Sequence, residues 1–281
     1  MISILQLGMV DYATGLRLQE QLVSVRKEGR IGDALLLLEH TPVITLGRNA
    51  HSHNVLASAE FLAQRGVEVF ECNRGGDVTF HGPGQLVAYP IFDLRGFPSS
   101  SPNRSTMGVI EFVRSLEEVL IRTCAEFGIP TKRISGLTGV WTGEDARRST
   151  SNGGTSDSGG PVERGSTGPE AKIAALGVHI SRGITSHGIA LNVNTDLSYF
   201  NLIVPCGITS KAVTSIAKEL DREVAMQEVA HTLARNFGKV FNSQILWLDS
   251  LDALLGNNLG VPMKPPKEIR ELRCEDESTW A

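Results

Sequence analysis

The chain has 281 residues, of which 41% are hydrophobic and 21% are charged, and its net charge at pH 7 is −4. This composition is typical of a soluble globular protein with one large domain or two small ones, and it offers no excess of positive charge for binding nucleic acid. The longest apolar runs are too short to cross a bilayer, and the first residues lack the layout of a secretory signal. We therefore expect an intracellular protein.

The first half of the chain alternates between strand and helix patterns. Strands are expected over residues 2–7, 34–40, 43–46, 67–72 and 86–94, and helices after Asp11 and over residues 58–65 and 107–127. Residues 74–85 form a glycine-rich loop between two of these strands. Glycines permit close approach of the backbone to a ligand, but tight turns need them too. The loop matches neither a Walker A motif nor a dinucleotide fingerprint, so by itself it indicates no nucleotide site.

The composition changes abruptly at residues 143–169, which are rich in Gly, Ser and Thr, and Val162 is their only branched aliphatic residue. Such a segment cannot bury enough surface to offset the entropy of ordering, so we expect a disordered surface insertion. Strands are then expected over residues 172–180, 188–193 and 244–248, with a short element at 210–220 and a helix at 226–241. We expect one domain over residues 1–248, followed by a flexible tail over residues 249–281.

The four cysteines, at positions 72, 124, 206 and 274, show no CxxC pair and no zinc-like spacing. Cys206 lies between a proline and a glycine, in a segment expected to turn. A thiol is a good nucleophile only as thiolate, and a nearby cation or base lowers its pKa. Lys172 is a candidate for that cation, and a dyad of Cys206 with His81 is the alternative. His81 and His187 each precede a glycine and either contact a substrate or cap local backbone.

Four blocks of sequence resemble, in order, the signatures of lipoyl(octanoyl) transferases. They are RGGDVTFHGPGQ at residues 74–85, KIAALG at 172–177, SHGIALN at 186–192 and VPCGI at 204–208. The resemblance implies an α/β (α+β) fold in which a mixed β-sheet is packed by helices, as in the catalytic domain of biotin and lipoate protein ligases. The wording of residues 183–192 is nearest to eukaryotic organellar members, which implies a mitochondrial location, with a cytoplasmic one as the alternative.

The same resemblance implies an acyltransferase that moves an octanoyl group from octanoyl-acyl carrier protein to a lysine of lipoyl domains. The acceptors would be the lipoyl domains of 2-oxoacid dehydrogenases and the glycine cleavage H protein, in the first step of endogenous protein lipoylation. An acyl thioester on Cys206 would be the intermediate, and Lys172 the second catalytic residue. No metal, cofactor, nucleic acid or membrane would take part.

Substrate-binding residues implied by the resemblance fall in the glycine-rich loop and the two later blocks. They are Arg74, Gly75, Gly76, Asp77, Val78, Thr79, Phe80, His81, Ala175, Leu176, Gly177, Gly188, Ile189 and Ala190. Two other functions stay open: an ATP-dependent lipoate or biotin protein ligase, and a non-catalytic binder of acyl carrier or lipoyl domains. Dependence on ATP separates the ligase from the transferase, since a ligase must first form an acyl-adenylate.

Overall fold

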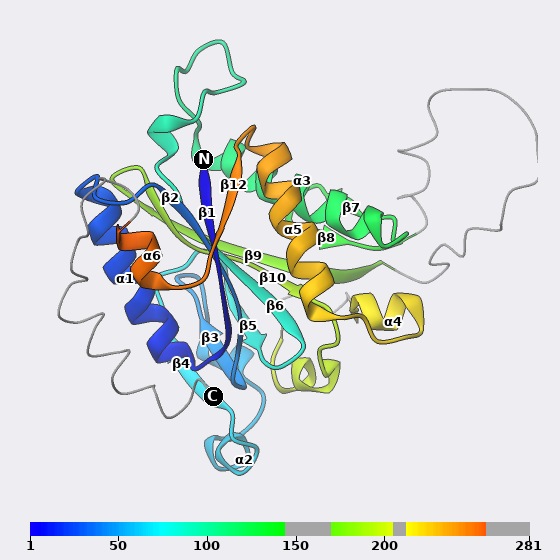
Figure 1. Cartoon of the computed structure of the whole chain (residues 1–281). Helices are drawn as coiled ribbons and strands as arrows, with labels where there is room; N and C mark the ends of the chain where they lie inside the picture. The colour runs from blue at the N-terminus through cyan, green and yellow to red at the C-terminus, as the bar shows by residue number, and fades with distance from the viewer. Residues whose placement is uncertain (144–169, 205–211, 257–281) are drawn as a thin grey trace, which may run out of the picture.

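A mixed β-sheet forms the centre of the molecule in the computed structural model, which describes residues 1–143, 170–204 and 212–256. Within those ranges the sheet has nine strands in the order β12-β1-β2-β6-β10-β9-β8-β7, with β11 beside β9 (Figure 1). A smaller sheet has the order β4-β3-β5. The strands are β1 Ile2–Val10, β2 Asp33–His40, β3 Val43–Leu46, β4 Glu68–Glu71, β5 Val78–His81, β6 Gln85–Ile91, β7 Lys132–Ile134, β8 Leu137–Trp141, β9 Ala171–Ser181, β10 Ile184–Asn192, β11 Ala212–Val213 and β12 Ile245–Leu248. The helices are α1 Tyr12–Lys27, α2 Ala59–Gln64, α3 Val109–Glu126, α4 Ile216–Leu220, α5 Met226–Val240 and α6 Leu251–Gly256.

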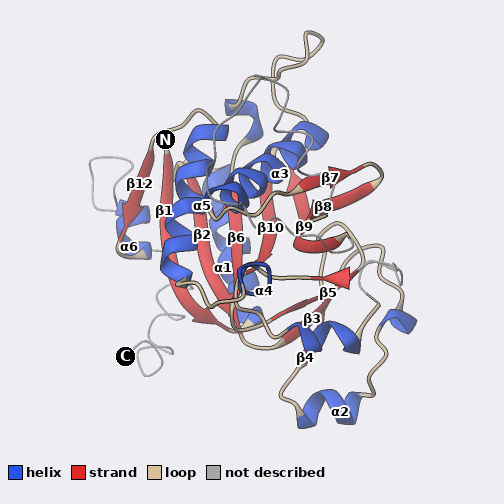
Figure 2. Ribbon diagram, turned by 90° about the vertical axis from the view of Figure 1, so that its right-hand side faces the viewer, coloured by secondary structure: helices blue, strands red, loops and turns tan. Residues whose placement is uncertain are grey.

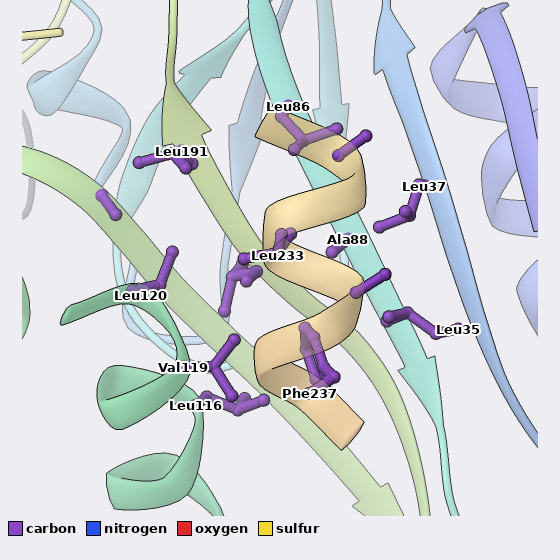
Figure 3. Packing of buried hydrophobic residues seen from close by; sticks show 14 of the residues in the cluster. Leu35, Leu37, Leu86, Ala88, Leu116, Val119, Leu120, Leu191, Leu233 and Phe237 are labelled. Atoms are coloured by element: carbon purple, nitrogen blue, oxygen red, sulfur yellow. The ribbon is translucent and has the colours of Figure 1, made fainter. Parts of the chain in front are cut away.

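Helices α3 and α5 cover one face of the large sheet. Figure 3 shows Leu233 and Phe237 of α5 packed over side chains of β2 and β6, among them Leu35 and Leu86. Leu233 and Phe237 are four residues apart, so they lie on one side of the helix, and both are fully buried. This face therefore forms the largest apolar core described for the chain.

The opposite face of the same strands packs against α1 and α6. Leu36 of β2 and Val87 of β6 alternate with the residues beneath α5 and so point the other way, toward Leu22 of α1 and Leu254 of α6. The small sheet lies beside this face together with α2, as the view in Figure 2 shows. A third apolar cluster, which includes Ile44 and Phe80, fills the space within that part of the molecule.

The expected fold class is confirmed, because the large sheet is mixed and packed by helices on both faces. Several elements differ from the expectation: β5 forms inside the expected glycine-rich loop, β7 was not expected, and β10 begins at Ile184. Structure also continues past residue 248, since α6 buries Leu254 and Leu255. Residues 144–169 of the expected insertion and 257–281 of the expected tail lie outside the described residues. No helix among the described residues is long and apolar enough to span a membrane.

Candidate active site

A pocket of about 480 Å³, including its open mouth, lies on the sheet face that carries α1. Its floor is formed by four small residues of the β9–β10 hairpin. Ala175 pairs with Ala190, and Gly177 pairs with Gly188, so the four small residues lie directly opposite one another on one face. The short side chains leave a hollow above the sheet. The lining residues are Tyr12, Arg74, Gly76, Asp77, Val78, Thr79, His81, Val87, Tyr89, Ala175, Leu176, Gly177, His187, Gly188, Ile189 and Ala190.

The glycine-rich segment before β5 closes one side of this pocket. Gly75 N donates to Val178 O at 3.0 Å, which lays the segment directly on β9. A Cβ on Gly177 would lie 2.7 Å from Gly75 O, so the contact requires glycine there. Arg74 lines the pocket, but its guanidinium donates to Thr45 O at 2.6 Å and to Gly75 O at 3.0 Å. Arg74 therefore fastens the segment to β3.

Asp77 links the same segment to the chain that leads toward Cys206. Its carboxylate accepts from Val78 N at 2.7 Å and from Asn54 Nδ2 at 2.8 Å. The carbonyl of Asn54 in turn accepts from Val204 N at 2.7 Å. Asn54 therefore joins Asp77 to Val204, which precedes Cys206 by two residues in the sequence.

Both histidines considered from the sequence line the pocket in neutral form. His81 Nδ1 donates to Gln85 Oε1 at 2.7 Å, and His187 Nε2 donates to Asn73 Oδ1 at 2.7 Å, because amide oxygens can only accept. Burial, with a smaller contribution from the charge of Arg74, lowers the pKa of each to about 3. Near pH 7 neither imidazole carries the positive charge that would stabilise a thiolate.

Lys172 borders a second, smaller pocket of about 310 Å³. The two pockets share Thr79, Ala175 and Ala190 in their lining, so they meet at the β9–β10 floor. Lys172 is only 9% exposed, and its Nζ lies 5.1 Å from the centre of the Trp141 ring, a cation–π distance. A buried amine in a pocket that adjoins the larger one is well placed for proton transfer.

Cys206 lies outside the described residues, but the ends of its segment are fixed beside the site. The chain enters from Val204, which is bonded to Asn54, and returns at β11, where Val213 pairs with Lys172. Thr214 N also donates to Lys172 O at 3.0 Å. The segment that carries the thiol therefore starts beside the glycine-rich segment and ends beside the lysine.

The structure brings most of the implied binding residues to the larger pocket, with two exceptions. Gly75 contacts β9 through its backbone, and Phe80 points away, stacked on Tyr199 with ring centres 4.6 Å apart. Four further lining residues were not among those implied: Tyr12, Val87, Tyr89 and His187. Strand alternation could have indicated Val87 and Tyr89, which take the face opposite Leu86. Tyr12 is buried and its hydroxyl has no hydrogen-bond partner, so it can serve a bound ligand.

Known proteins similar to this chain fall in one group. Residues 11–238 match the family described as the lipoyl protein ligase A/B catalytic domain. The chain is 55% identical over 276 residues to an octanoyltransferase of Koribacter versatilis, with 98% of each chain covered. It is 57% identical over 256 residues to one of Acidobacterium capsulatum, covering 90% of this chain and 96% of the relative. A solved bi-partite lipoate protein ligase from Thermoplasma acidophilum has the same fold, with a TM-score of 0.62, 16% identity and coverage of 99% and 92%.

The expected mitochondrial location is wrong. The similar octanoyltransferases, including a third from Solibacter usitatus at 47% identity, come from bacteria, which have no mitochondria. Bacterial relatives favour the cytoplasmic alternative.

Proposed function

The chain belongs to the lipoyl protein ligase A/B catalytic domain family, and from this premise we propose that it is an octanoyltransferase acting in protein lipoylation. Octanoyltransferases that share 55% and 57% of its residues over nearly the whole chain support an acyltransferase of this kind. A fold shared with ligases does not decide the chemistry, since the two classes differ in how the acyl group is activated.

The donor we propose is octanoyl-acyl carrier protein, and the acceptors are lysines of lipoyl domains, such as those of 2-oxoacid dehydrogenases and the glycine cleavage H protein. The pocket above the β9–β10 hairpin supports this, because the small residues Ala175, Gly188 and Ala190 give an acyl chain an apolar floor. The Tyr12 hydroxyl and the histidine ring edges supply polar groups at its walls.

In the first step the Cys206 thiolate attacks the carbonyl carbon of the donor thioester. The new S–C bond forms as the bond to the carrier's thiol breaks, so an octanoyl-Cys206 thioester and a free carrier thiol result. In the second step the uncharged amine of the acceptor lysine attacks this thioester. Cys206 leaves as thiolate, and the amide nitrogen loses one proton.

Lys172 is the residue we propose to stabilise the thiolate and to relay these protons. The single observation that supports the proposal is the pairing of Val213 with Lys172, because the chain that follows the Cys206 segment runs beside the backbone of Lys172. Burial lowers the pKa of His81 to about 3, so its imidazole is a weak base for a dyad with Cys206, and this supports Lys172 as the partner. The proposed reaction consumes no ATP, since the acyl group arrives already activated as a thioester and leaves as a more stable amide.

Transfer from octanoyl-acyl carrier protein to a lipoyl domain, followed by mass spectrometry without ATP or magnesium, tests this function. We expect an octanoyl amide on the acceptor when octanoyl-acyl carrier protein is the donor. No octanoyl amide should form when ATP and free octanoate are supplied instead of that donor. A product that appears only with ATP and free acid would show the ligase chemistry of the alternative. A protein that binds both partners and forms neither product would be a non-catalytic binder.

A further inference from the structure

Lys172 reaches the pocket face because β9 contains one extra residue. Trp141 of β8 pairs with Lys172, whereas Val140 pairs with Ala174, so Ile173 has no partner of its own. One extra residue in a strand moves the side chains beyond it to the other face of the sheet. Ile173 and Ala174 accordingly both belong to the core under α3 and α5, although Ala174 also borders the small pocket, whereas Lys172 lines that pocket and is no part of the core. Without this bulge, Lys172 would share the face of Ala174.

Two residues of β8 then receive the redirected side chain. A Cβ on Gly139 would lie 2.5 Å from Lys172 Cε and 3.3 Å from its Nζ, so the lysine stem crosses the backbone of Gly139. Gly139 also has a φ of +138°, a conformation that favours glycine. Two residues on, the ring of Trp141 lies 5.1 Å from the ammonium.

The backbone of Gly139 is itself held from the core side. Its N–H donates to Oε1 of Glu117 at 3.3 Å, and Glu117 is fully buried on α3. Oε2 of the same carboxylate accepts from Arg114 Nη1 at 2.7 Å and from Arg133 Nε at 3.1 Å. The two guanidinium groups offset the charge that is buried with Glu117. Helix α3 therefore fixes the position of β8 beneath Lys172.

We propose that Gly139 and Trp141 are positioning residues for Lys172, and that the β9 bulge together with these two contacts sets where the ammonium lies. This inference rests on the role of Lys172 proposed above. A side chain at position 139 displaces the lysine stem, and loss of the ring at 141 removes the surface against which the ammonium is held. Either change moves the ammonium from the position that its proposed role requires, so the Cys206 thiolate should be less favoured.

The test is the pH dependence of Cys206 alkylation, followed by mass spectrometry on the peptide that contains Cys206. We expect Gly139→Ala and Trp141→Leu each to raise the midpoint of the alkylation rate against pH by about one pH unit. At any pH below that midpoint, the alkylation rate should then fall about tenfold. Trp141→Phe keeps an aromatic face and should stay near the wild-type midpoint. Gly136→Ala is the matched control: Gly136 also has a positive φ, of +79°, but nothing lies within 4 Å of its Cβ position.

Double variants separate positioning from general damage. If Gly139 acts through Lys172, adding Gly139→Ala to Lys172→Ala should not shift the midpoint further. A wild-type profile for both Gly139→Ala and Trp141→Leu would overturn the inference, as would additive shifts in the double variant. If Lys172→Ala alone leaves the midpoint unchanged, the role proposed for Lys172 fails first and the inference with it. Should Gly139→Ala not fold, the pair Trp141→Leu and Trp141→Phe decides the question.

Discussion

The two faces of the central sheet are built differently although they share the same strands. Beneath α3 and α5, the side chains of β2 and β6 are aliphatic, as Leu35 and Leu86 illustrate. On the opposite face, the same strands carry buried polar groups, including His40 and Tyr89, which share a hydrogen bond at 2.7 Å. Gln85 also lies there and donates to Asn192 Oδ1 at 2.9 Å.

This difference separates stability from chemistry within one sheet. Apolar burial on the first face supplies most of the free energy of folding, because it scales with the area removed from water. Buried polar groups cost free energy unless they are hydrogen-bonded, and on the second face hydrogen bonds such as that between His40 and Tyr89 hold them in a defined geometry. Strand alternation allows β6 to serve both faces, and a change on one face should therefore leave the function of the other largely intact.

The largest expected effect comes from Phe237→Ala on the core face. Phe237 is fully buried, so its truncation should lower the free energy of unfolding by about 3–5 kcal/mol. Urea unfolding measures this loss, and transfer activity per folded molecule should stay within about twofold. Ile110→Ala on α3 is the control, since Ile110 is 79% exposed and its truncation should change stability by less than about 0.5 kcal/mol. A large loss of activity in fully folded Phe237→Ala would show that the faces are coupled.

The buried histidines on the second face of the sheet should make the free energy of unfolding depend on pH, at pH values above those at which carboxylates titrate. Burial lowers the folded-state pKa of His81 and His187 to about 3 and that of His40 to about 4, from an ordinary value of 6.5. Below about pH 6.5 the unfolded chain therefore binds more protons, and stability falls as pH decreases, by up to about 1.4 kcal/mol per pH unit for each histidine. Above about pH 6.5 the histidines are largely uncharged in both the folded and the unfolded chain, so the stability is no longer reduced by their protonation.

Urea titrations between about pH 5 and 6.5 measure this slope. His81→Gln should reduce it by about 1.4 kcal/mol per pH unit, because one titrating group is removed. The exposed His231, replaced by Gln, should leave the slope unchanged. Equal slopes in wild type and His81→Gln would mean that His81 is not held neutral by the fold.

A smaller effect is expected from a substitution in the floor of the two pockets. Ala190 lines both pockets and pairs with Ala175, so Ala190→Val adds two methyl groups to the floor. We expect the KM for the octanoyl donor to rise about tenfold, with a shift toward shorter acyl groups, and little change in the unfolding midpoint. Ala190→Gly is the control, because it cannot narrow the hollow. An unchanged chain-length preference in Ala190→Val would place the acyl group elsewhere.

Much of this architecture could be predicted from the sequence, because apolar alternation marks buried strands such as residues 34–40. The lining of the larger pocket was largely anticipated by resemblance. The resemblance also implied Phe80, which points away from the pocket; all four residues of β5 are buried, and such a strand gives no signal of which face each takes. The bulge at Ile173 has no sequence signal either, because it depends on the register with β8. Helix α6 is six residues long and was obscured by the proline-rich composition that follows it.

The most direct test of the reactive face is to incubate the protein with octanoyl-acyl carrier protein in the absence of an acceptor and to map the adduct. We predict one octanoyl group, released by hydroxylamine, on the peptide that contains Cys206, and none in Cys206→Ala. Cys72 is the internal comparison, because it is partly exposed and its Sγ donates to Leu46 O at 3.4 Å. Cys72→Ala should form the adduct at the wild-type rate. An octanoyl group on Cys72, or an adduct that persists at full rate in Cys206→Ala, would contradict the account.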